Sequence, residues 1–301
     1  MSKIQYLIID WGTTNFRAFA VDENTQVVSQ KELSLGLLNV KDGNFAKALE
    51  DILTDWIEDY ASLPLYMAGM VGSLKGWVNV DYATTPCSIE NIVAKAYHFD
   101  SPWGAKATIF PGVSHQYDGD KFDVMRGEEV QLFGLSALLD KTNSQDTQNC
   151  IVLPGTHSKH AIYDHGISEF SSYMTGELFS LLSKHSLIAT REKNEEFERT
   201  VFLDGIKDAQ SGEFSNRVFL AWTNRVFKKY HEAQMEDYLS GLLIGFELRN
   251  IKKQKIYFIG GEPLCQRYQL AAESLGKDTQ YFSGNECFLA GMNNLISGIK
   301  K

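Results

Sequence analysis

The sequence lacks long hydrophobic runs, paired cysteines and an excess of basic residues. Its first apolar run spans only residues 6–9 before a carboxylate, which is too short for a signal peptide or a membrane span. The four cysteines are widely scattered, so neither a disulfide framework nor a zinc knuckle is predicted. A formal net charge of −9 argues against non-specific binding to nucleic-acid phosphates. We therefore expect a cytoplasmic protein with no membrane or nucleic-acid partner.

The chain does contain enough apolar sequence for two domains. With 301 residues and 44% hydrophobic composition, it can bury one large core or two moderate ones, and its length favours two. Apolar stretches at 6–10, 16–21 and 26–33, separated by turn residues, predict two successive hairpins. Helical spacing over 45–60 and a strand-like run at 65–68 follow. This β-β-β-α-β order is typical of a mixed sheet covered by helices.

A second copy of this layout begins near residue 149. Gly12-Thr13 in the first turn corresponds to Gly155-Thr156, and the turn at Asp22 corresponds to one at Asp164. We therefore predict an α/β fold in which two similar domains, each a mixed sheet flanked by helices, form a cleft between them.

Domain boundaries follow from this repeat. The Gly- and Asp-rich stretch 111–124 is the expected crossing, which gives domains at 1–115 and 116–301. The last helix is expected to pack back on the first domain. Further periodic segments predict helices over 214–226, 235–246 and 288–299 and a strand over 256–259.

The strongest local signal lies in residues 8–17, where a buried-strand pattern ends at Asp10 and turns through Gly12, Thr13 and Thr14. Amide and hydroxyl groups in such a turn can bind phosphate oxygens, and the carboxylate can hold Mg²⁺ through water. The alternative is a hairpin turn in which Asp10 only accepts backbone hydrogen bonds.

The second signal is the turn formed by Gly155, Thr156, His157, Ser158 and Lys159. Its hydroxyl, imidazole and ammonium groups would suit phosphate contacts, although such turns are common when taken alone. The sequence has no Gly-x4-Gly-Lys-Ser/Thr motif, which disfavours a P-loop kinase. The interpretation of this turn as a phosphate site therefore depends on its similarity to the turn at Gly12 and Thr13.

The third signal is a helix start in residues 123–134, where Arg126 precedes Glu128 and Glu129. A carboxylate there could accept the proton of an attacking hydroxyl group. Acidic residues in a first helical turn are also common caps that favour the helix dipole, so both interpretations stand.

Two further glycine-containing segments are candidate ligand loops. Gly260 and Gly261 end a strand, where an adenine ring could lie against backbone, although a tight strand-to-helix turn explains them equally. The other loop, residues 67–77, contains small residues and a Trp that could border a polar pocket, although Trp77 could equally be a core residue.

Taken together, these motifs resemble the 2-dehydro-3-deoxygalactonokinase family, in the sugar-kinase branch of the actin and heat-shock ATPase superfamily. The resemblance spans most of the chain. It rests on Asp10–Thr14, Gly69–Ser73 with Gly76-Trp77, Asp123–Glu129, Leu153–Lys159, Met174–Phe179 and Tyr238–Gly245.

The resemblance implies two ribonuclease-H-like domains that close over ATP and a small sugar acid. Asp10 would organise Mg²⁺, and Glu128 would occupy the place of the catalytic base, although the wider superfamily has Asp there and Glu129 stays an alternative. Candidate nucleotide contacts are Gly12, Thr13, Thr14, Gly155, Thr156, His157, Ser158, Lys159, Gly260 and Gly261. Candidate substrate contacts are Gly72, Ser73, Lys75, Trp77, Arg126 and Glu129.

The implied reaction transfers the γ-phosphoryl group of ATP to the terminal hydroxyl of 2-dehydro-3-deoxy-galactonate. Phosphate turns do not reveal sugar stereochemistry, so a kinase for another 2-keto-3-deoxy acid or a hexose stays open. A non-catalytic ATP-binding regulator and an actin-type structural protein are weaker alternatives. A homodimer is one assembly that the sequence leaves open.

Overall fold

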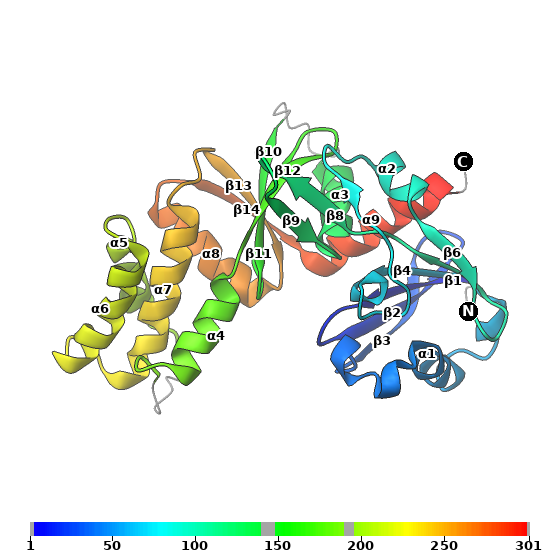
Figure 1. Cartoon of the computed structure of the whole chain (residues 1–301), viewed down its shortest axis with the longest axis horizontal. Coiled ribbons are helices and arrows are strands. Elements are labelled where there is room, and N and C mark those ends of the chain that lie inside the picture. The colour runs from blue at the N-terminus through cyan, green and yellow to red at the C-terminus, as the bar shows by residue number, and fades with distance from the viewer. Residues whose placement is uncertain (1–2, 140–147, 190–195, 300–301) are drawn as a thin grey trace. The chain divides into compact units, whose positions relative to one another are not determined.

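The computed structural model describes residues 3–139, 148–189 and 196–299, which fold into two compact units (Figure 1). Unit 1 is built from the described parts of 1–147, 162–170 and 284–301, and unit 2 from those of 148–161 and 171–283. The division into ribonuclease-H-like domains at residues 115 and 116 stays a prediction beside these packing units. Within the described ranges, no helix has the length and apolar character needed to cross a bilayer.

The main sheet of unit 1 has six strands in the order β3-β2-β1-β4-β7-β6. The first three strands pair antiparallel, whereas β4 and β7 continue the sheet in parallel with β1. The strands are β1 Ile4–Trp11, β2 Phe16–Asp22, β3 Val27–Leu33, β4 Leu65–Gly69, β6 Tyr97–Asp100 and β7 Lys106–Ile109. The predicted hairpins and mixed sheet are confirmed.

Helices and a small second sheet complete unit 1. The α-helices are α1 Phe45–Thr54, α2 Ile89–Ala94, α3 Glu128–Leu139 and α9 Gly284–Ile299, and the 3-10 helices are η1 Leu37–Asn39, η2 Lys41–Gly43, η3 Tyr60–Ser62 and η4 Met70–Gly72. The small sheet contains β5 Ala83–Thr84, β8 Val113–Gln116 and β9 Phe122–Met125. The stretch 111–124, for which the sequence predicts the crossing between domains, thus contains the antiparallel β8–β9 hairpin.

Unit 2 combines a five-stranded sheet with a group of helices. The strand order is β12-β11-β10-β13-β14, with β10 Asn149–Leu153, β11 Ser158–Tyr163, β12 Ile167–Tyr173, β13 Lys255–Gly260 and β14 Asp278–Ser283. The helices are α4 Thr175–His185, α5 Arg199–Asp208, α6 Phe214–Val226, η6 Glu232–Gln234, α7 Met235–Leu248 and α8 Glu262–Ser274. The end of β11 and the start of β12, within residues 162–170, belong to unit 1.

The two main sheets share the order of their first four strands, counted along the chain. Across each sheet the strands lie in the order third, second, first, fourth. The fourth strand is parallel to the first, and the next strand in the sheet is parallel to the fourth. The repeat predicted from the two Gly-Thr turns is therefore present in the fold. In each sheet, the Gly-Thr turn joins the first strand to the second.

The buried apolar residues of β1 fix the strand that leads into the first Gly-Thr turn. Leu7, Ile8 and Ile9 of β1 are fully buried, as expected for a strand covered on both faces. Asn44 caps the N-terminus of α1, and its side chain accepts a hydrogen bond from the Lys47 amide at 3.1 Å. The helix ends at Thr54, earlier than the predicted stripe through residue 60.

Candidate functional site

A pocket of about 650 Å³ lies beside the β1–β2 turn of unit 1. Its wall combines the end of β1, the start of β2, the end of β3 and one residue of α9. The lining residues are Asp10, Gly12, Thr13, Thr14, Asn15, Phe16, Arg17, Glu32, Leu33, Ser34 and Asn285. Asp10, Gly12, Thr13 and Thr14 are thus brought together as predicted from the sequence.

Asp10 is paired with a cation inside this pocket. Arg17 Nε donates to Asp10 Oδ2 at 3.0 Å, and Arg17 Nη2 forms a closer ion pair with the same oxygen. Burial raises the pKa of Asp10, and the charge and hydrogen bonds of Arg17 counteract only part of that rise. The other oxygen, Oδ1, lies toward Gly69, where an added Cβ would be 3.2 Å away. Arg17 therefore occupies one carboxylate oxygen and leaves the second for another ligand.

The backbone of the Thr13-Thr14 turn is fixed from two sides. The Gly12 amide donates to Asn15 O at 2.9 Å, and the Gly36 amide donates to Thr14 O at 2.8 Å. A Cβ on Gly36 would lie 2.1 Å from Thr13 O, so only glycine fits at that position. Thr13 and Thr14 are themselves exposed. Their hydroxyl and amide groups are therefore held in a rigid turn that solvent and a ligand can reach.

The start of α3 lies next to the Asp10 turn. Gly127 has φ +110, and its added Cβ would be 3.6 Å from the Cα of Gly69, the residue that borders Asp10. Glu128 Oε2 accepts from the Arg126 amide at 3.1 Å, and Glu129 Oε2 accepts from the Gly127 amide at 2.7 Å. Both carboxylates therefore cap backbone amides, which was the structural alternative for this motif.

Burial distinguishes the two adjacent glutamates. Glu129 is 0% exposed, and burial, followed by the neighbouring Glu128 charge, raises its pKa to about 8. Glu128 remains partly exposed. Of the two carboxylates, Glu128 is therefore the one that a ligand can reach from the surface.

Arg126 lies beneath the Gly72-Ser73 loop and is 9% exposed. Its Nη2 donates to Val80 O at 2.7 Å, and its guanidinium lies 4.3 Å from the centroid of the Tyr82 ring. Within the part of the chain that the structure describes, Arg126 Nε, Arg126 Nη1 and Ser73 Oγ have no hydrogen-bond partner. A Cβ on Gly72 would lie 2.9 Å from Arg126 Nη1. The structure therefore brings three predicted substrate residues together.

Lys75 and Trp77 lie differently. Lys75 is exposed. The Trp77 ring packs edge-on against Phe99 at 5.2 Å between centroids and lies 6.3 Å from Trp103, at the margin of the unit 1 core. These contacts agree with the interpretation of Trp77 as a core residue, and its role in binding stays a prediction.

In unit 2, the β10–β11 turn divides into an exposed and a buried part. Thr156 and His157 are exposed, whereas Ser158 and Lys159 are buried. Ser158 Oγ donates to Glu247 Oε1 at 2.7 Å, and Lys159 Nζ donates to His157 O at 2.9 Å. The Ser158 hydroxyl, a predicted phosphate contact, is thus already engaged with a buried carboxylate.

The second glycine motif of unit 2 lies against this turn. An added Cβ on Gly260 would be 3.6 Å from Pro154 O, and nothing lies within 4 Å of the corresponding position on Gly155 or Gly261. A Cβ on Gly176, at the start of α4, would meet Gly155 O at 2.4 Å. The turn is therefore packed against α4 and the β13–α8 junction, while Gly155 and Gly261 keep open space.

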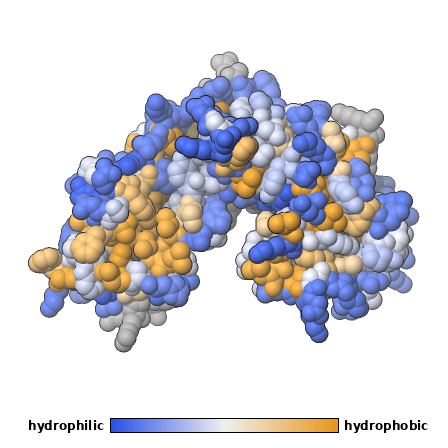
Figure 2. All heavy atoms as spheres, in the orientation of Figure 1, coloured by the Kyte–Doolittle hydropathy of each residue, from blue (hydrophilic) through white to orange (hydrophobic). Residues whose placement is uncertain are grey.

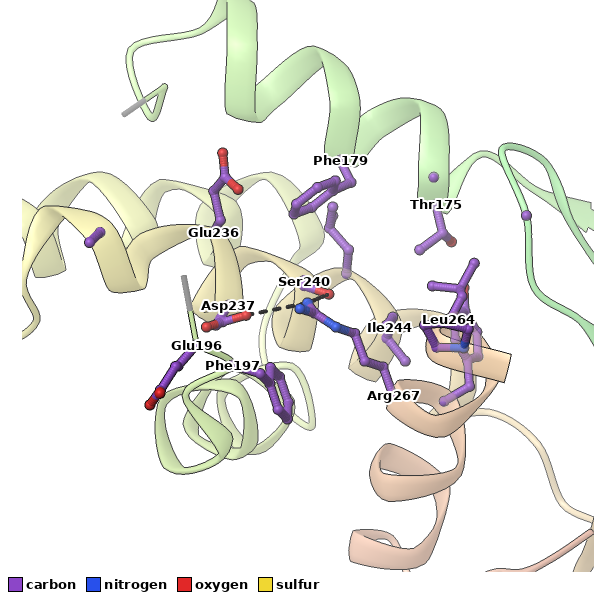
Figure 3. Close-up of a pocket in the computed structure, with 16 residues that line it drawn as sticks. Thr175, Phe179, Glu196, Phe197, Glu236, Asp237, Ser240, Ile244, Leu264 and Arg267 are labelled. Atoms are coloured by element: carbon purple, nitrogen blue, oxygen red, sulfur yellow. Dashed lines mark hydrogen bonds and ion pairs between the residues drawn. The ribbon is translucent and has the colours of Figure 1, made fainter. Parts of the chain in front are cut away.

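A pocket of about 510 Å³ lies beside these glycines, between α4, α7 and α8 (Figure 3). The Arg267 side chain extends from α8 toward α7, where its Nη1 lies 3.3 Å from Asp237 Oδ1 and 3.4 Å from Ser240 Oγ. Its guanidinium lies over the Phe197 ring. The lining residues are Gly155, Thr175, Gly176, Phe179, Glu196, Phe197, Ala233, Glu236, Asp237, Ser240, Leu243, Ile244, Pro263, Leu264, Arg267 and Tyr268. Mostly apolar walls with a few polar groups are typical of a small-molecule site.

The sequence interpretation missed most of this pocket. It assigned α7 by its apolar stripe, whereas the pocket face of α7 carries Asp237, Ser240 and Ile244. Their spacing of three and four residues was a usable signal, because polar residues on one face of a largely apolar helix need partners.

Comparisons with known proteins match the whole chain to one kind of kinase. A family model described as 2-keto-3-deoxy-galactonokinase matches residues 10–295. The 2-dehydro-3-deoxygalactonokinase of Escherichia coli (strain K12) is 31% identical over 303 residues, covering 98% of both chains. A crystal structure from Sinorhizobium meliloti, described as "a putative 2-dehydro-3-deoxygalactonokinase protein", is 27% identical with a TM-score of 0.88, covering 98% of this chain and 96% of that one.

Proposed function

Because the chain belongs to the 2-keto-3-deoxy-galactonokinase family, we propose that it phosphorylates the 6-hydroxyl of 2-dehydro-3-deoxy-D-galactonate with ATP. The observation that carries this proposal is the family match over residues 10–295, which includes both Gly-Thr turns, the Glu128 helix start and the Gly260-Gly261 junction. The enzyme would act in the cytoplasm in galactonate catabolism.

The unit 2 pocket fits the adenosine part of ATP. Its apolar walls suit a purine ring, and Gly261 has open space for close approach of the ligand to the backbone. Gly155, Thr156 and His157 would then bind phosphate from the exposed side of the β10–β11 turn. The buried residues Ser158 and Lys159 would shape that turn from below.

In unit 1, Gly12, Thr13 and Thr14 would bind phosphate groups of ATP. The fixed backbone of this turn supports the assignment, because backbone amides held in a turn can form an anion-binding concavity. We propose that this turn, like the β10–β11 turn of unit 2, is a binding site for nucleotide phosphate.

Asp10 is a suitable magnesium ligand. Mg²⁺ usually takes one or two carboxylates and keeps several waters, and the Oδ1 oxygen of Asp10 is not paired with Arg17. No group of three or more His, Cys, Asp or Glu residues able to hold a metal exists among the described residues, which agrees with an ion held mainly by phosphates and water. Bound there, the ion would neutralise phosphate charge.

Glu128 would accept the proton of the attacking 6-hydroxyl group, and Glu129 would hold the Gly127 amide beside it. The buried donors of Arg126, with Gly72 and Ser73, would bind the sugar-acid carboxylate, because guanidinium groups favour carboxylates. Lys75 would add positive charge at the loop edge, and Trp77 would support the loop from the core side.

Homodimer assembly stays part of the proposal. Hydrophobic residues gather at the surface over the helices of unit 2 (Figure 2), and Phe219, Val226 and Phe227 are exposed there. Exposed apolar groups that cluster in this way are typical of protein interfaces.

An ADP-release assay with a panel of acceptors tests the proposed function. The panel contains 2-dehydro-3-deoxy-D-galactonate, its gluconate epimer and neutral hexoses. We expect the highest kcat/KM with the galactonate derivative. A preference for the epimer or a hexose would favour the alternative kinase. A rate of ADP release that no acceptor changes would favour the ATP-binding regulator.

A further inference from the structure

Glu247 on α7 is a buried carboxylate to which no step of the proposed reaction assigns a role. It is 4% exposed. Its Oε1 accepts from Ser158 Oγ at 2.7 Å and lies 2.7 Å from His160 Nε2, and its Oε2 accepts from Tyr268 OH at 2.7 Å. Glu247 therefore joins α7 to β11 and α8 at once.

A fourth partner extends this cluster to α4. Burial raises the pKa of Glu247, but hydrogen bonds from His160, Ser158 and the Thr175 side chain outweigh it, so the pKa is lowered overall. Glu247 is therefore ionised and accepts hydrogen bonds from donors on β11, α4 and α8. A buried charge of this kind is stable only when its partners stay in place.

Two of the partners belong to the wall of the unit 2 pocket, and the other two belong to β11, which begins at the end of the β10–β11 turn. Thr175 and Tyr268 line the pocket themselves. Ser158 directly follows the exposed phosphate-binding residues Thr156 and His157. The cluster therefore underlies both the pocket wall and the phosphate turn, and the Glu247 carboxylate itself is buried behind that wall.

We propose that Glu247 is a positioning residue for ATP, which holds the Gly155–His157 turn, the start of α4 and α8 in the geometry that binds the nucleotide. The inference rests on the proposed kinase function. The Ser158 hydroxyl acts here by fixing the turn through Glu247. The residues proposed to bind the sugar acid lie in unit 1, whereas Glu247 and its partners lie in unit 2.

The test compares direct ATP binding with sugar-acid kinetics in Glu247→Gln. Glutamine keeps the size of the side chain but turns one acceptor into a donor. We expect the Kd for ATP to rise about tenfold, the scale for losing one hydrogen bond to a charged group, while the KM for the sugar acid stays unchanged. The matched control is Glu273→Gln, an exposed change near the end of α8, which should leave both constants at wild-type values.

A purely structural role gives a different result. Glu247→Gln would then lower the melting temperature while the folded protein binds ATP with the wild-type Kd, and that result would overturn the proposal. If Glu247→Gln does not fold, Tyr268→Phe replaces it, because it removes only the hydroxyl that donates to Glu247 and keeps the ring in the pocket wall. An unchanged Kd in Tyr268→Phe would also overturn it. Failure of wild-type protein to bind ATP would instead refute the proposed function itself.

Discussion

At the scale of single residues, burial decides which acidic groups can do chemistry. Glu128 and Glu129 are adjacent in sequence and both cap backbone amides, yet only Glu128 is partly exposed. The same holds in unit 2, where Ser158 and Lys159 are buried and Thr156 is exposed. The sequence could not separate the exposed residues of these candidate segments from the buried ones, because burial depends on elements far away in the chain.

Glu128→Gln should retain ATP binding and lose about a hundredfold or more in kcat, the usual scale for a general base. The amide oxygen can still accept from the Arg126 amide, so the helix start is preserved. Steady-state kinetics with 2-dehydro-3-deoxy-D-galactonate measures the effect, and Glu128→Asp is the matched variant that keeps a carboxylate. Near-wild-type turnover in Glu128→Gln would remove this residue from the role of base.

Glu129 makes the stability of the protein depend on pH. Its pKa is about 8 in the folded protein against an ordinary value of 4.5. As pH rises through this interval, the unfolded chain loses the proton while the folded chain keeps it, so the free energy of unfolding falls. Below the interval both states are protonated, and above it both are ionised.

Glu129→Gln removes this titration and keeps an oxygen for the Gly127 amide. We therefore expect the melting temperature of the variant, relative to wild type, to be higher at pH 8 than at pH 5. Thermal unfolding of both proteins across that range measures the difference. A difference that does not change with pH would show that Glu129 is ionised in the folded state.

At the scale of elements, glycines allow two helix pairs to pack at close range. In unit 1, an added Cβ on Gly134 of α3 would lie 1.7 Å from Cys287 O of α9, and one on Gly291 would lie 1.9 Å from Val130 O. In unit 2, a Cβ on Gly241 of α7 would lie 1.9 Å from Phe202 O of α5. Backbone atoms cannot yield to such contacts as side chains can.

Gly241→Ala should therefore lower the free energy of unfolding by roughly 1–3 kcal/mol, the usual cost of overpacking. Helix propensity alone predicts the opposite sign, because alanine stabilises a helix relative to glycine. Denaturant unfolding of the variant and wild type distinguishes the two. A variant as stable as wild type, or more stable, would show that α5 and α7 separate at little cost.

Most elements could be predicted from local patterns, and the exceptions have physical reasons. The hairpins of both sheets, α6, α7, β13 and α9 follow from apolar periodicity and turn residues. The β5–β8–β9 sheet was missed because its strands have four residues or fewer, and such short runs show little alternation. The close helix contacts at Gly134 of α3, Gly205 of α5 and Gly241 of α7 could not be identified from apolar periodicity.

At the scale of the whole molecule, two sheets that share the order of their first four strands each present a Gly-Thr turn between their first and second strands. Unit 1 adds the acidic helix start and the buried Arg126, and unit 2 adds the apolar pocket. This division of labour suits a kinase, because positioning and charge stabilisation supply most of the catalysis in phosphoryl transfer.

The central claim is transfer of the γ-phosphoryl group of ATP to one hydroxyl of the sugar acid. Phosphorus-31 NMR of the complete reaction with 2-dehydro-3-deoxy-D-galactonate follows that group directly. The account predicts a new phosphomonoester signal coupled to the protons on carbon 6, appearing as ATP is converted to ADP. A spectrum that shows only inorganic phosphate, or a phosphate ester at another position, would contradict it.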